Sequence, residues 1–373
     1  MNILILTGKF GMGHLSVSKA LEEEFKVINK NINVNIVDLI EYVYPNRAEL
    51  IYKSFSQVVN ICPELYNLMY KASEKVEVDM RLPGNSINKK MKNLIDLYSP
   101  DIIISTIPMC SRTISAYKAV SNIDIPLVTC VTDISMHIEW VAPKTDYYLV
   151  PTLEIKYNLI KNGINGKNIF VVGIPVKQSF KNIRHKESSS NKKNILIMGG
   201  GLGLIPNLDE MMNELAKIPN LSITIITGKN KRSYLQFLDK YKNAEIIGFT
   251  NEVDKYLSKA DIIITKPGGV TLFESIFSET PMFVIKPFLA QEKSNAKYIE
   301  ANSIGKILWR DREDTTKSLC EFIYDEENLN AMKENMREIK VHTLNSNLTN
   351  VLKYLMNEAK YEVNPNYNMS IVI

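Results

Sequence analysis

Residues 261–295 combine a glycine turn with a cluster of polar side chains, in the sequence DIIITKPGGVTLFESIFSETPMFVIKPFLAQEKSN. The apolar run IIIT predicts a buried parallel strand. Gly268 and Gly269 follow it, and glycines in a turn leave no β-carbon in the way of a ligand. We expect a helix after the turn, capped by Thr271, with Glu274 three residues later as the capping-box partner. Because the first turn of a helix presents free N–H groups, this arrangement favours phosphate binding.

A second polar cluster lies one strand further along the chain. The sequence MFVIKPF predicts that strand, and AQEKSN after it predicts a polar loop in which Gln291, Glu292 and Asn295 can hydrogen-bond a sugar. The carboxyl ends of neighbouring parallel strands lie at one edge of a sheet, where open α/β sheets bind ligands. Paired glycines also occur in ordinary tight turns, so the interpretation as a ligand site depends on this second cluster.

His14 is the candidate general base. It follows the glycine turn GMG at 11–13 and is expected at the start of a helix that faces the ligand. Imidazole titrates near neutral pH, so its unprotonated form can accept a proton from an attacking hydroxyl. The positive end of the helix dipole is expected to lower the pKa of His14 and keep the ring neutral. The alternative is a histidine that only caps the helix or lies on the surface.

Three residues near position 135 are further candidates. Asp133 ends the run LVTCVTD and could orient a histidine or a substrate hydroxyl. His137 and Trp140 are three residues apart, so a helix would place them on one face. Trp140 could stack on a sugar or line an acyl channel, and core packing is the equally open alternative.

Two loops in the second half of the chain also carry candidate residues. Gly200 belongs to the loop GGGLG at 199–203, which can approach phosphates but lacks the GxGxxG spacing followed by an acid. Phe249 follows a predicted strand and can lie beside a flat base, although a phenylalanine there is also typical of core packing. The sequence contains no P-loop, DxD pair or HExxH motif, and we therefore expect no dedicated metal site and no metal cofactor.

The composition is that of a soluble protein with two domains: 373 residues, 45% of them hydrophobic and 23% charged. The formal net charge of +4 suits anionic ligands or an anionic membrane surface, and we expect no nucleic-acid partner. Four cysteines without CxxC spacing indicate free thiols in a reducing cytoplasm. No apolar run reaches the ~20 residues of a membrane span. The first residues are expected to form a strand rather than a signal peptide.

Alternating strand and helix patterns predict two doubly wound α/β domains, each with a glycine loop after its first strand. We expect the first domain at 1–176, a linker at 177–194, the second domain at 195–343, and a helix and tail at 344–373 that can cross back onto the first. The facing carboxyl edges of the two sheets would form a central cleft. Residues 42–98 interrupt the first domain with an aromatic-rich helical segment, which either packs the core of its own domain or forms a surface for lipid.

Several motifs occur in the order that is typical of one enzyme family. They are GMGH at 11–14, VTDISMHIEWVAPKTDYYLVPT at 131–152, GIPV at 173–176, MGGGLG at 198–203, GF at 248–249, TKPGGVTLFES at 265–275 and QEKSN at 291–295. Together they resemble the monogalactosyldiacylglycerol synthase and processive diacylglycerol glucosyltransferase group of family 28 glycosyltransferases. The resemblance covers roughly residues 1–355.

The resemblance implies a GT-B fold, in which two Rossmann-like domains face a central cleft. The N-terminal domain would bind the acceptor and the C-terminal domain a UDP-sugar. It implies inverting transfer of a hexose to diacylglycerol or glycosyl-diacylglycerol, without a metal cofactor. The expected location is cytoplasmic, as a peripheral protein on the anionic inner face of the cell membrane.

Matching motif positions imply roles for individual residues. His14 matches the base, and Gly13, Asp133, His137 and Trp140 lie in motifs of the acceptor side. On the nucleotide-sugar side, Gly268 and Gly269 match the diphosphate loop, Glu274 the ribose-binding acid, and Gln291, Glu292 and Asn295 the sugar-contacting loop, while Phe249 lies where the uracil is held. Gly200 and Thr271 are further candidates for the nucleotide-sugar site.

Several alternatives remain open from the sequence. Leu289-Ala290 stand where this family usually has Pro-Gly, so UDP-glucose, UDP-galactose and UDP-N-acetylglucosamine are all candidate donors. The same architecture would serve a UDP-N-acetylglucosamine-using transferase with another lipid-linked acceptor, or a UDP-sugar 2-epimerase. A non-catalytic nucleotide-sugar-binding module is a further alternative.

Overall fold

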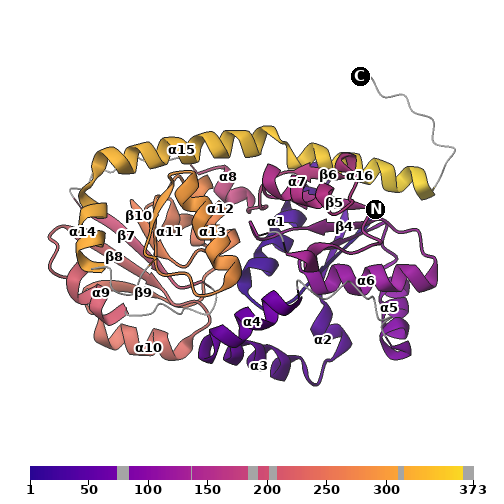
Figure 1. The fold of residues 1–373 in the computed structure, drawn as a ribbon, viewed down its shortest axis with the longest axis horizontal. Helices are drawn as coiled ribbons and strands as arrows, with labels where there is room; N and C mark the ends of the chain where they lie inside the picture. The colour runs from indigo at the N-terminus through magenta and orange to yellow at the C-terminus, as the bar shows by residue number, and fades with distance from the viewer. Residues whose placement is uncertain (74–83, 136, 184–191, 201–207, 310–314, 364–373) are drawn as a thin grey trace.

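The computed structural model of the chain describes residues 1–73, 84–135, 137–183, 192–200, 208–309 and 315–363. It has two lobes, each built on a six-stranded parallel sheet with flanking helices (Figure 1). The N-terminal lobe lies at the right of Figure 1 and the C-terminal lobe at the left. Within these described ranges, no helix is both long and apolar enough to cross a lipid bilayer.

The first sheet is formed by strands β1 (Asn2–Thr7), β2 (Asn33–Asp38), β3 (Ile102–Ser105), β4 (Leu127–Cys130), β5 (Tyr147–Val150) and β6 (Ile169–Val171). Their spatial order is β2-β1-β3-β4-β5-β6. All residues of β3 and β4 are buried, as expected for a parallel sheet that is covered on both faces. The chain leaves β1 toward β2 on one side and continues with β3 on the other, so the topological switch point lies between β1 and β3.

The second sheet is formed by β7 (Lys193–Met198), β8 (Leu221–Ile226), β9 (Ala244–Ile247), β10 (Ile262–Thr265), β11 (Met282–Val284) and β12 (Gly305–Ile307). Their order is β12-β11-β10-β7-β8-β9, which places the switch point between β7 and β10. Met198 and Thr265, the last residues of these two strands, are paired in the sheet. The loops after β7 and β10 therefore leave the sheet side by side.

Helices connect the strands of both lobes. In the N-terminal lobe these are α1 (Met12–Ile28), α2 (Leu39–Val43), α3 (Ala48–Ile61), α4 (Pro63–Ser73), α5 (Asn85–Tyr98), α6 (Pro108–Ser121), α7 (Leu153–Lys161) and the 3₁₀-helices η1 (Ile138–Trp140) and η2 (Gly166–Asn168). The remaining helices are α8 (Gln178–Lys181), α9 (Leu208–Leu215), α10 (Lys231–Lys240), α11 (Val253–Leu257), α12 (Gly269–Phe277), α13 (Ala290–Ala301), α14 (Thr315–Tyr324), α15 (Glu326–Asn345) and α16 (Leu348–Val363).

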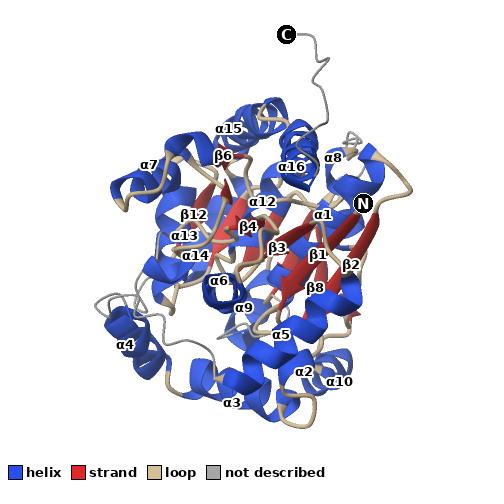
Figure 2. Cartoon of the chain, turned by 90° about the vertical axis from the view of Figure 1, so that its right-hand side faces the viewer, coloured by secondary structure: helices blue, strands red, loops and turns tan. Residues whose placement is uncertain are grey.

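The aromatic-rich segment forms α2 to α5, with residues 74–83 outside the described part, and some of its aromatic residues pack in the core of the lobe, which was one of the two alternatives. Tyr42 and Tyr98 pack against the buried core beneath β1 and β3. Phe55 of α3 and Tyr66 of α4 instead line a pocket. Both views place α3 and α4 at the end of the molecule opposite α15 and α16 (Figures 1 and 2).

The C-terminal helices connect the two lobes. α15 runs along the C-terminal lobe, and α16 packs on α1 of the N-terminal lobe (Figure 1). Thr349 of α16 donates a hydrogen bond to the buried Glu24 of α1 over 2.9 Å, and Lys181 of α8 forms an ion pair with the same carboxylate. One apolar cluster contains both Val17 of α1 and Phe273 of α12, so the lobes share part of their core.

The expected cap of α12 is wrong. The helix begins at Gly269, and Gly268 occupies the N-cap position without a side-chain hydrogen bond. Thr271 therefore lies inside the first turn, where it cannot form a capping box with Glu274.

The expected polar loop AQEKSN is also wrong, because these residues form the first turns of α13. The side chain of Glu292 accepts hydrogen bonds from the backbone N–H groups of Phe288 (3.0 Å) and Leu289 (3.2 Å). A carboxylate that satisfies these otherwise unpaired N–H groups stabilises a helix start, and this local pairing explains the difference.

Other expectations fall partly outside the described residues. Within the expected linker at 177–194, α8 occupies 178–181 and β7 begins at Lys193, whereas 184–191 are outside the described part. Residues 201–203 of the GGGLG loop and the tail beyond Val363 are outside it as well.

Candidate active site

The first catalytic candidate lies at the switch point of the first sheet. His14 is in the first turn of α1, after the loop that follows β1. Its Nδ1 donates a hydrogen bond to the carbonyl oxygen of Thr106, directly after β3, over 3.0 Å. Oγ1 of Thr132, which follows β4, lies 3.0 Å from the same nitrogen. Loops after three strands therefore hold the ring in one place.

These contacts determine the protonation state of His14. Because a carbonyl oxygen only accepts, Nδ1 carries the hydrogen, and the neutral ring keeps its lone pair on Nε2. Burial lowers the pKa of His14 from 6.5 to about 4, and the hydrogen bond to Thr106 opposes this change. We expected the helix dipole to lower this pKa; burial is instead the main cause. The ring is therefore neutral near pH 7, as a proton acceptor must be.

The start of α12 lies against the N-terminal lobe at this point. A β-carbon on Gly269 would come within 2.4 Å of the carbonyl oxygen of Thr132, and one on Gly13 within 3.0 Å of Cγ2 of Val270. Both glycines therefore permit the close approach of the two lobes. Gly269 is buried, whereas Gly268 is partly exposed.

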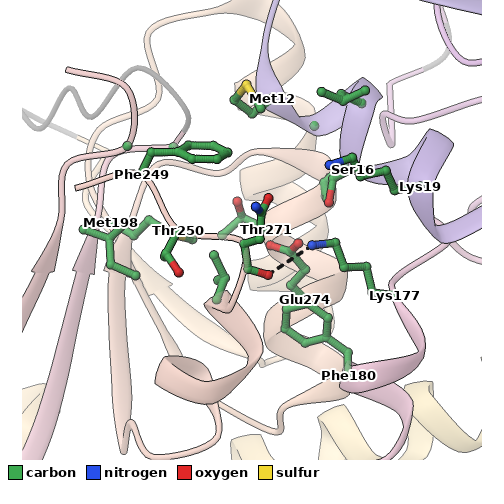
Figure 3. A pocket seen from close by; sticks show the side chains of 18 residues that line it. Met12, Ser16, Lys19, Lys177, Phe180, Met198, Phe249, Thr250, Thr271 and Glu274 are labelled. Atoms are coloured by element: carbon green, nitrogen blue, oxygen red, sulfur yellow. Dashed lines mark hydrogen bonds between the residues drawn. The ribbon is translucent and has the colours of Figure 1, made fainter. Parts of the chain in front are cut away.

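A first pocket lies between α1 and the carboxyl edge of the second sheet (Figure 3). Phe249 and Thr250 form one side, Ser16 of α1 lies opposite, and Glu274 lies between them. Phe249 is 48% exposed, so core packing does not explain this residue. The other residues of the pocket that carried a sequence assignment are Gly13, Gly200 and Thr271.

Glu274 is the titratable group at the base of the first pocket. Burial raises the pKa of its carboxyl from 4.5 to about 7, and the positive charge of Lys177 opposes this change. Lys177 itself donates a hydrogen bond to the backbone oxygen of Asn251 over 3.1 Å. A buried carboxylate can accept hydrogen bonds from a pair of hydroxyls, such as those of a ribose.

A second pocket brings residues of both lobes together. His14 and Asp133 line it from the N-terminal lobe, and Gly200, Lys266 and Gln291 line it from the C-terminal lobe. Gly200 lines both pockets, so the two adjoin at the loop after β7. The candidate base and the glycine loop of the second sheet thus share one cleft.

The three polar residues of α13 have different surroundings. Asn295 is buried, donates to the backbone oxygen of Pro267 (2.9 Å) and accepts from the backbone N–H of Ile134 (3.1 Å). It therefore bridges the lobes. Glu292 caps α13 and lies 3.6 Å from Nζ of Lys266. Gln291 lines the second pocket directly.

Asp133 lines the second pocket but does not orient the His14 ring, because Nδ1 of His14 is in contact with Thr106 and Thr132 instead. Burial raises the pKa of Asp133 from 3.8 to about 6, a hydrogen bond with Asn295 lowers it, and the negative charge of Glu292 raises it further. An acid of this kind can exchange a proton or a hydrogen bond with a ligand hydroxyl near neutral pH.

His137 and Trp140 lie on a 3₁₀ turn rather than on a face of an α-helix. Nε2 of His137 donates to the backbone oxygen of Tyr70 (2.8 Å), and Nδ1 accepts from the backbone N–H of Glu139 (3.3 Å). Both ring nitrogens thus have structural partners. Trp140 is 2% exposed and packs in a core cluster with Tyr148, and it also lines the second pocket, as His137 does.

Two family models match the chain. The model for monogalactosyldiacylglycerol (MGDG) synthase matches residues 14–176, and the model for the glycosyltransferase family 28 C-terminal domain matches 194–351. A processive diacylglycerol β-glucosyltransferase of Bacillus licheniformis is 30% identical over 94% of this chain and 94% of its own length. The chain belongs to this group of family 28 glycosyltransferases. It is thereby a UDP-sugar-dependent hexosyltransferase with a GT-B fold.

Solved structures agree with the fold assignment. MurG of Acinetobacter baumannii superposes with a TM-score of 0.56 at 12% identity, over 96% of this chain and 100% of that chain. A UDP-N-acetylglucosamine 2-epimerase superposes equally well, with a TM-score of 0.56 at 13% identity, over 100% and 99% of the two chains. The fold is therefore common to transferases and epimerases, and the family assignment comes from the sequence matches.

The sequence placed Phe55, Tyr66 and Tyr70 in the aromatic-rich segment without assigning them to this glycosyltransferase site, and Phe10 was missed. Phe10, Phe55, Tyr66 and Tyr70 form a chain of aromatic contacts along the second pocket, with consecutive ring centroids 4.9, 5.9 and 6.1 Å apart. The i, i+4 spacing of the two tyrosines within a helical segment was the available signal. Lys266 was also missed, although it directly precedes the glycine turn.

Proposed function

We propose that this glycosyltransferase moves a hexose, with inversion, from a UDP-sugar to diacylglycerol or a glycosyl-diacylglycerol at a membrane surface. The observation that carries the proposal is the second pocket, where His14 of one lobe and Gly200, Lys266 and Gln291 of the other face the same space. The named activity of the B. licheniformis relative supports the choice of acceptor.

In the proposed reaction, Nε2 of His14 accepts the proton of the acceptor hydroxyl. The hydroxyl oxygen forms a bond to the anomeric carbon of the hexose while the bond from that carbon to the diphosphate oxygen breaks. Attack from the side opposite the leaving group inverts the anomeric centre. The products are the glycolipid, UDP and a proton on His14.

Charge that develops on the departing diphosphate requires stabilisation. The first turn of α12 presents N–H groups without helical partners, and the ammonium group of Lys266 lies nearby in the second pocket. Together they would serve the purpose that a divalent cation serves in other transferases. We therefore propose transfer without a metal cofactor, and turnover that persists in EDTA would support this part.

The acceptor side carries a suitable membrane-facing surface. Leu50 and Ile61 of α3 and Leu68 of α4 are exposed by 65%, 77% and 66%, at the end of the molecule opposite α16 (Figure 2). Exposed aliphatic side chains on adjacent amphipathic helices favour insertion at a lipid interface. We propose that this surface docks on the inner face of the cell membrane, and that the aromatic chain of the second pocket lies on the lipid headgroup path toward His14.

The direct test is incubation of the protein with each of UDP-glucose, UDP-galactose and UDP-N-acetylglucosamine in the presence of diacylglycerol vesicles, followed by mass analysis of the lipid. A hexosylated lipid that forms with one donor supports the proposal and identifies that donor. Isomerisation of the UDP-sugar without an acceptor would indicate a 2-epimerase instead. UDP binding without turnover over a broad acceptor panel would indicate a non-catalytic module.

A further inference from the structure

Helix α4 of the N-terminal lobe contacts the start of α13 in the C-terminal lobe. Oδ1 of Asn67 accepts a hydrogen bond from the backbone N–H of Ala290 (2.8 Å), and Nδ2 of the same residue donates to the backbone oxygen of Phe288 (2.9 Å). A planar carboxamide satisfies both groups in only one orientation. Asn67 therefore fixes the position of the turn that leads into α13.

Local contacts constrain this turn only in part, because the carboxylate of Glu292 accepts hydrogen bonds from the backbone N–H groups of Phe288 and Leu289 but not from that of Ala290. Leu289 and Ala290 occupy its centre, and neither residue restricts the backbone as proline does. The contact from Asn67 comes from a residue more than two hundred positions away in the sequence. The other lobe thus adds a restraint on the N–H of Ala290 and the backbone oxygen of Phe288 to the local pairing by Glu292.

Tyr66, the residue before Asn67, contacts Gln291, which lies at the start of α13 and lines the second pocket. Nε2 of Gln291 donates a hydrogen bond to the hydroxyl oxygen of Tyr66 over 3.2 Å. Oε1 of Gln291 is buried and has no hydrogen-bond partner in the described part of the chain. A buried amide oxygen without a hydrogen-bond partner is unfavourable, and a hydroxyl of a bound ligand would supply the missing partner.

We propose that Tyr66 and Asn67 position Gln291 so that its free oxygen accepts a hydrogen bond from a hydroxyl of the donor hexose. This inference rests on the proposed function. Both residues are positioning residues, since they act through the start of α13. A helix of the acceptor-side lobe then determines how the donor sugar is recognised, and the donor site is complete only when α4 is docked on α13.

UDP and UDP-hexose should respond differently to changes in α4, because only the hexose meets Gln291. Calorimetric titration of the purified full chain with UDP and with the UDP-hexose that it transfers would measure both affinities. We expect Asn67→Ala and Tyr66→Phe each to raise the Kd of UDP-hexose about tenfold, the effect of one or two lost hydrogen bonds, and to change the Kd of UDP less than twofold. Glu64→Gln, an exposed change on the same helix, is the matched control and should alter neither.

A double-mutant cycle tests whether Tyr66 acts through Gln291. In a Gln291→Ala background, Tyr66→Phe should no longer raise the Kd of UDP-hexose, because its only proposed route has been removed. Equal weakening of UDP and UDP-hexose in the α4 variants, or no weakening of either, would overturn the inference, as would a full Tyr66→Phe effect in the Gln291→Ala background. If the unsubstituted protein bound no UDP at all, the proposed function would fail first, and the inference with it.

Discussion

Nδ1 of His14 lies 3.0 Å from the carbonyl oxygen of Thr106, and this one contact assigns the chemistry of the ring. It joins the first helix to the loop after β3, across the switch point of the first sheet. A hydrogen on Nδ1 leaves Nε2 as the nitrogen that can accept a proton. The fold thus places and orients this candidate base through contacts within the protein.

Replacement of His14 with alanine should remove the proton acceptor. We expect turnover of UDP-hexose to fall by about 10²–10⁴-fold, the usual contribution of a general base. The Kd of UDP should stay within about twofold, because His14 lines the second pocket and not the first pocket, which holds Phe249 and Glu274. Steady-state kinetics and calorimetry would measure the two quantities separately, and turnover that is unchanged would remove the base assignment.

The pKa of His14 also predicts a pH profile. Because this pKa is about 4 in the folded protein, the ring stays unprotonated above roughly pH 5. Turnover should therefore show no loss from His14 protonation between pH 7 and pH 5. Comparison of the pH–rate profiles of the unsubstituted protein and the Asp133→Asn variant would separate the two groups. Burial raises the pKa of Asp133 to about 6, so Asp133 titrates between pH 5 and pH 7, whereas His14 does not.

The contact between the lobes at Gly269 predicts a large difference between two neighbouring glycines. A β-carbon on Gly269 would come within 2.4 Å of the Thr132 carbonyl, whereas the nearest atom to one on Gly268 is Oγ1 of Thr271 at 3.8 Å. Gly269→Ala should lower the free energy of unfolding by about 1–3 kcal/mol, because the backbone must shift. Gly268→Ala is the matched control and should cost less than 1 kcal/mol. Denaturant titration of the two variants measures this; equal stabilities would contradict the close approach of the lobes.

Features that depend on residues close together in the sequence could be predicted from it, whereas features that depend on contacts between distant residues could not. Strand β10 begins and ends where the run IIIT does, and all of its residues are buried, because a buried parallel strand is a local pattern. His14 and the glycine turn after β10 were found because a glycine next to a chemically active residue is also a local signal.

Contacts between distant residues were not predictable in this way. The start of α13 pairs locally with Glu292, but Gln291 and Ala290 are also hydrogen-bonded to Tyr66 and Asn67 of the other lobe. The cost of a β-carbon at Gly269 depends on a carbonyl that follows β4. A single sequence does not reveal which distant residues will be in contact once the two lobes have folded.

The raised pKa of Glu274 predicts how stability varies with pH. Its pKa is about 7 in the folded protein and about 4.5 in an unfolded chain, so the folded state binds the proton more tightly. The free energy of unfolding should therefore fall as pH rises through this interval, by up to roughly 3 kcal/mol from this group. Glu274→Gln resembles the protonated acid and should remove this dependence.

Urea titrations at pH 5 and pH 8 test the role of Glu274 without reference to other groups. The unsubstituted protein and the Glu274→Gln variant should be similarly stable at pH 5, and the variant should be the more stable at pH 8. The same stability difference at both pH values would show that Glu274 ionises normally.

The apolar side chains of α3 and α4 predict where the protein meets the membrane. Leu50→Glu and Leu68→Glu each place a negative charge on the proposed docking surface, which anionic lipid repels and hydrocarbon excludes. We expect each change to lower binding to vesicles of anionic lipid at least about fivefold, equivalent to roughly 1 kcal/mol, while the Kd of UDP stays unchanged. Vesicle sedimentation with calorimetry in parallel measures both.

Leu153→Glu is the matched control for membrane docking, because Leu153 is also strongly exposed, by 59%, but belongs to α7, a helix near the end of the molecule away from α3 (Figure 2). It should leave vesicle binding as it is. If all three variants lost binding alike, general charge repulsion would be the cause; if none did, α3 and α4 would not be the docking surface. A selective loss of vesicle binding in the α3 and α4 variants would place the lipid beside α4. Because Asn67 of α4 contacts Ala290 at the start of α13, acceptor binding and donor recognition would then share one helix.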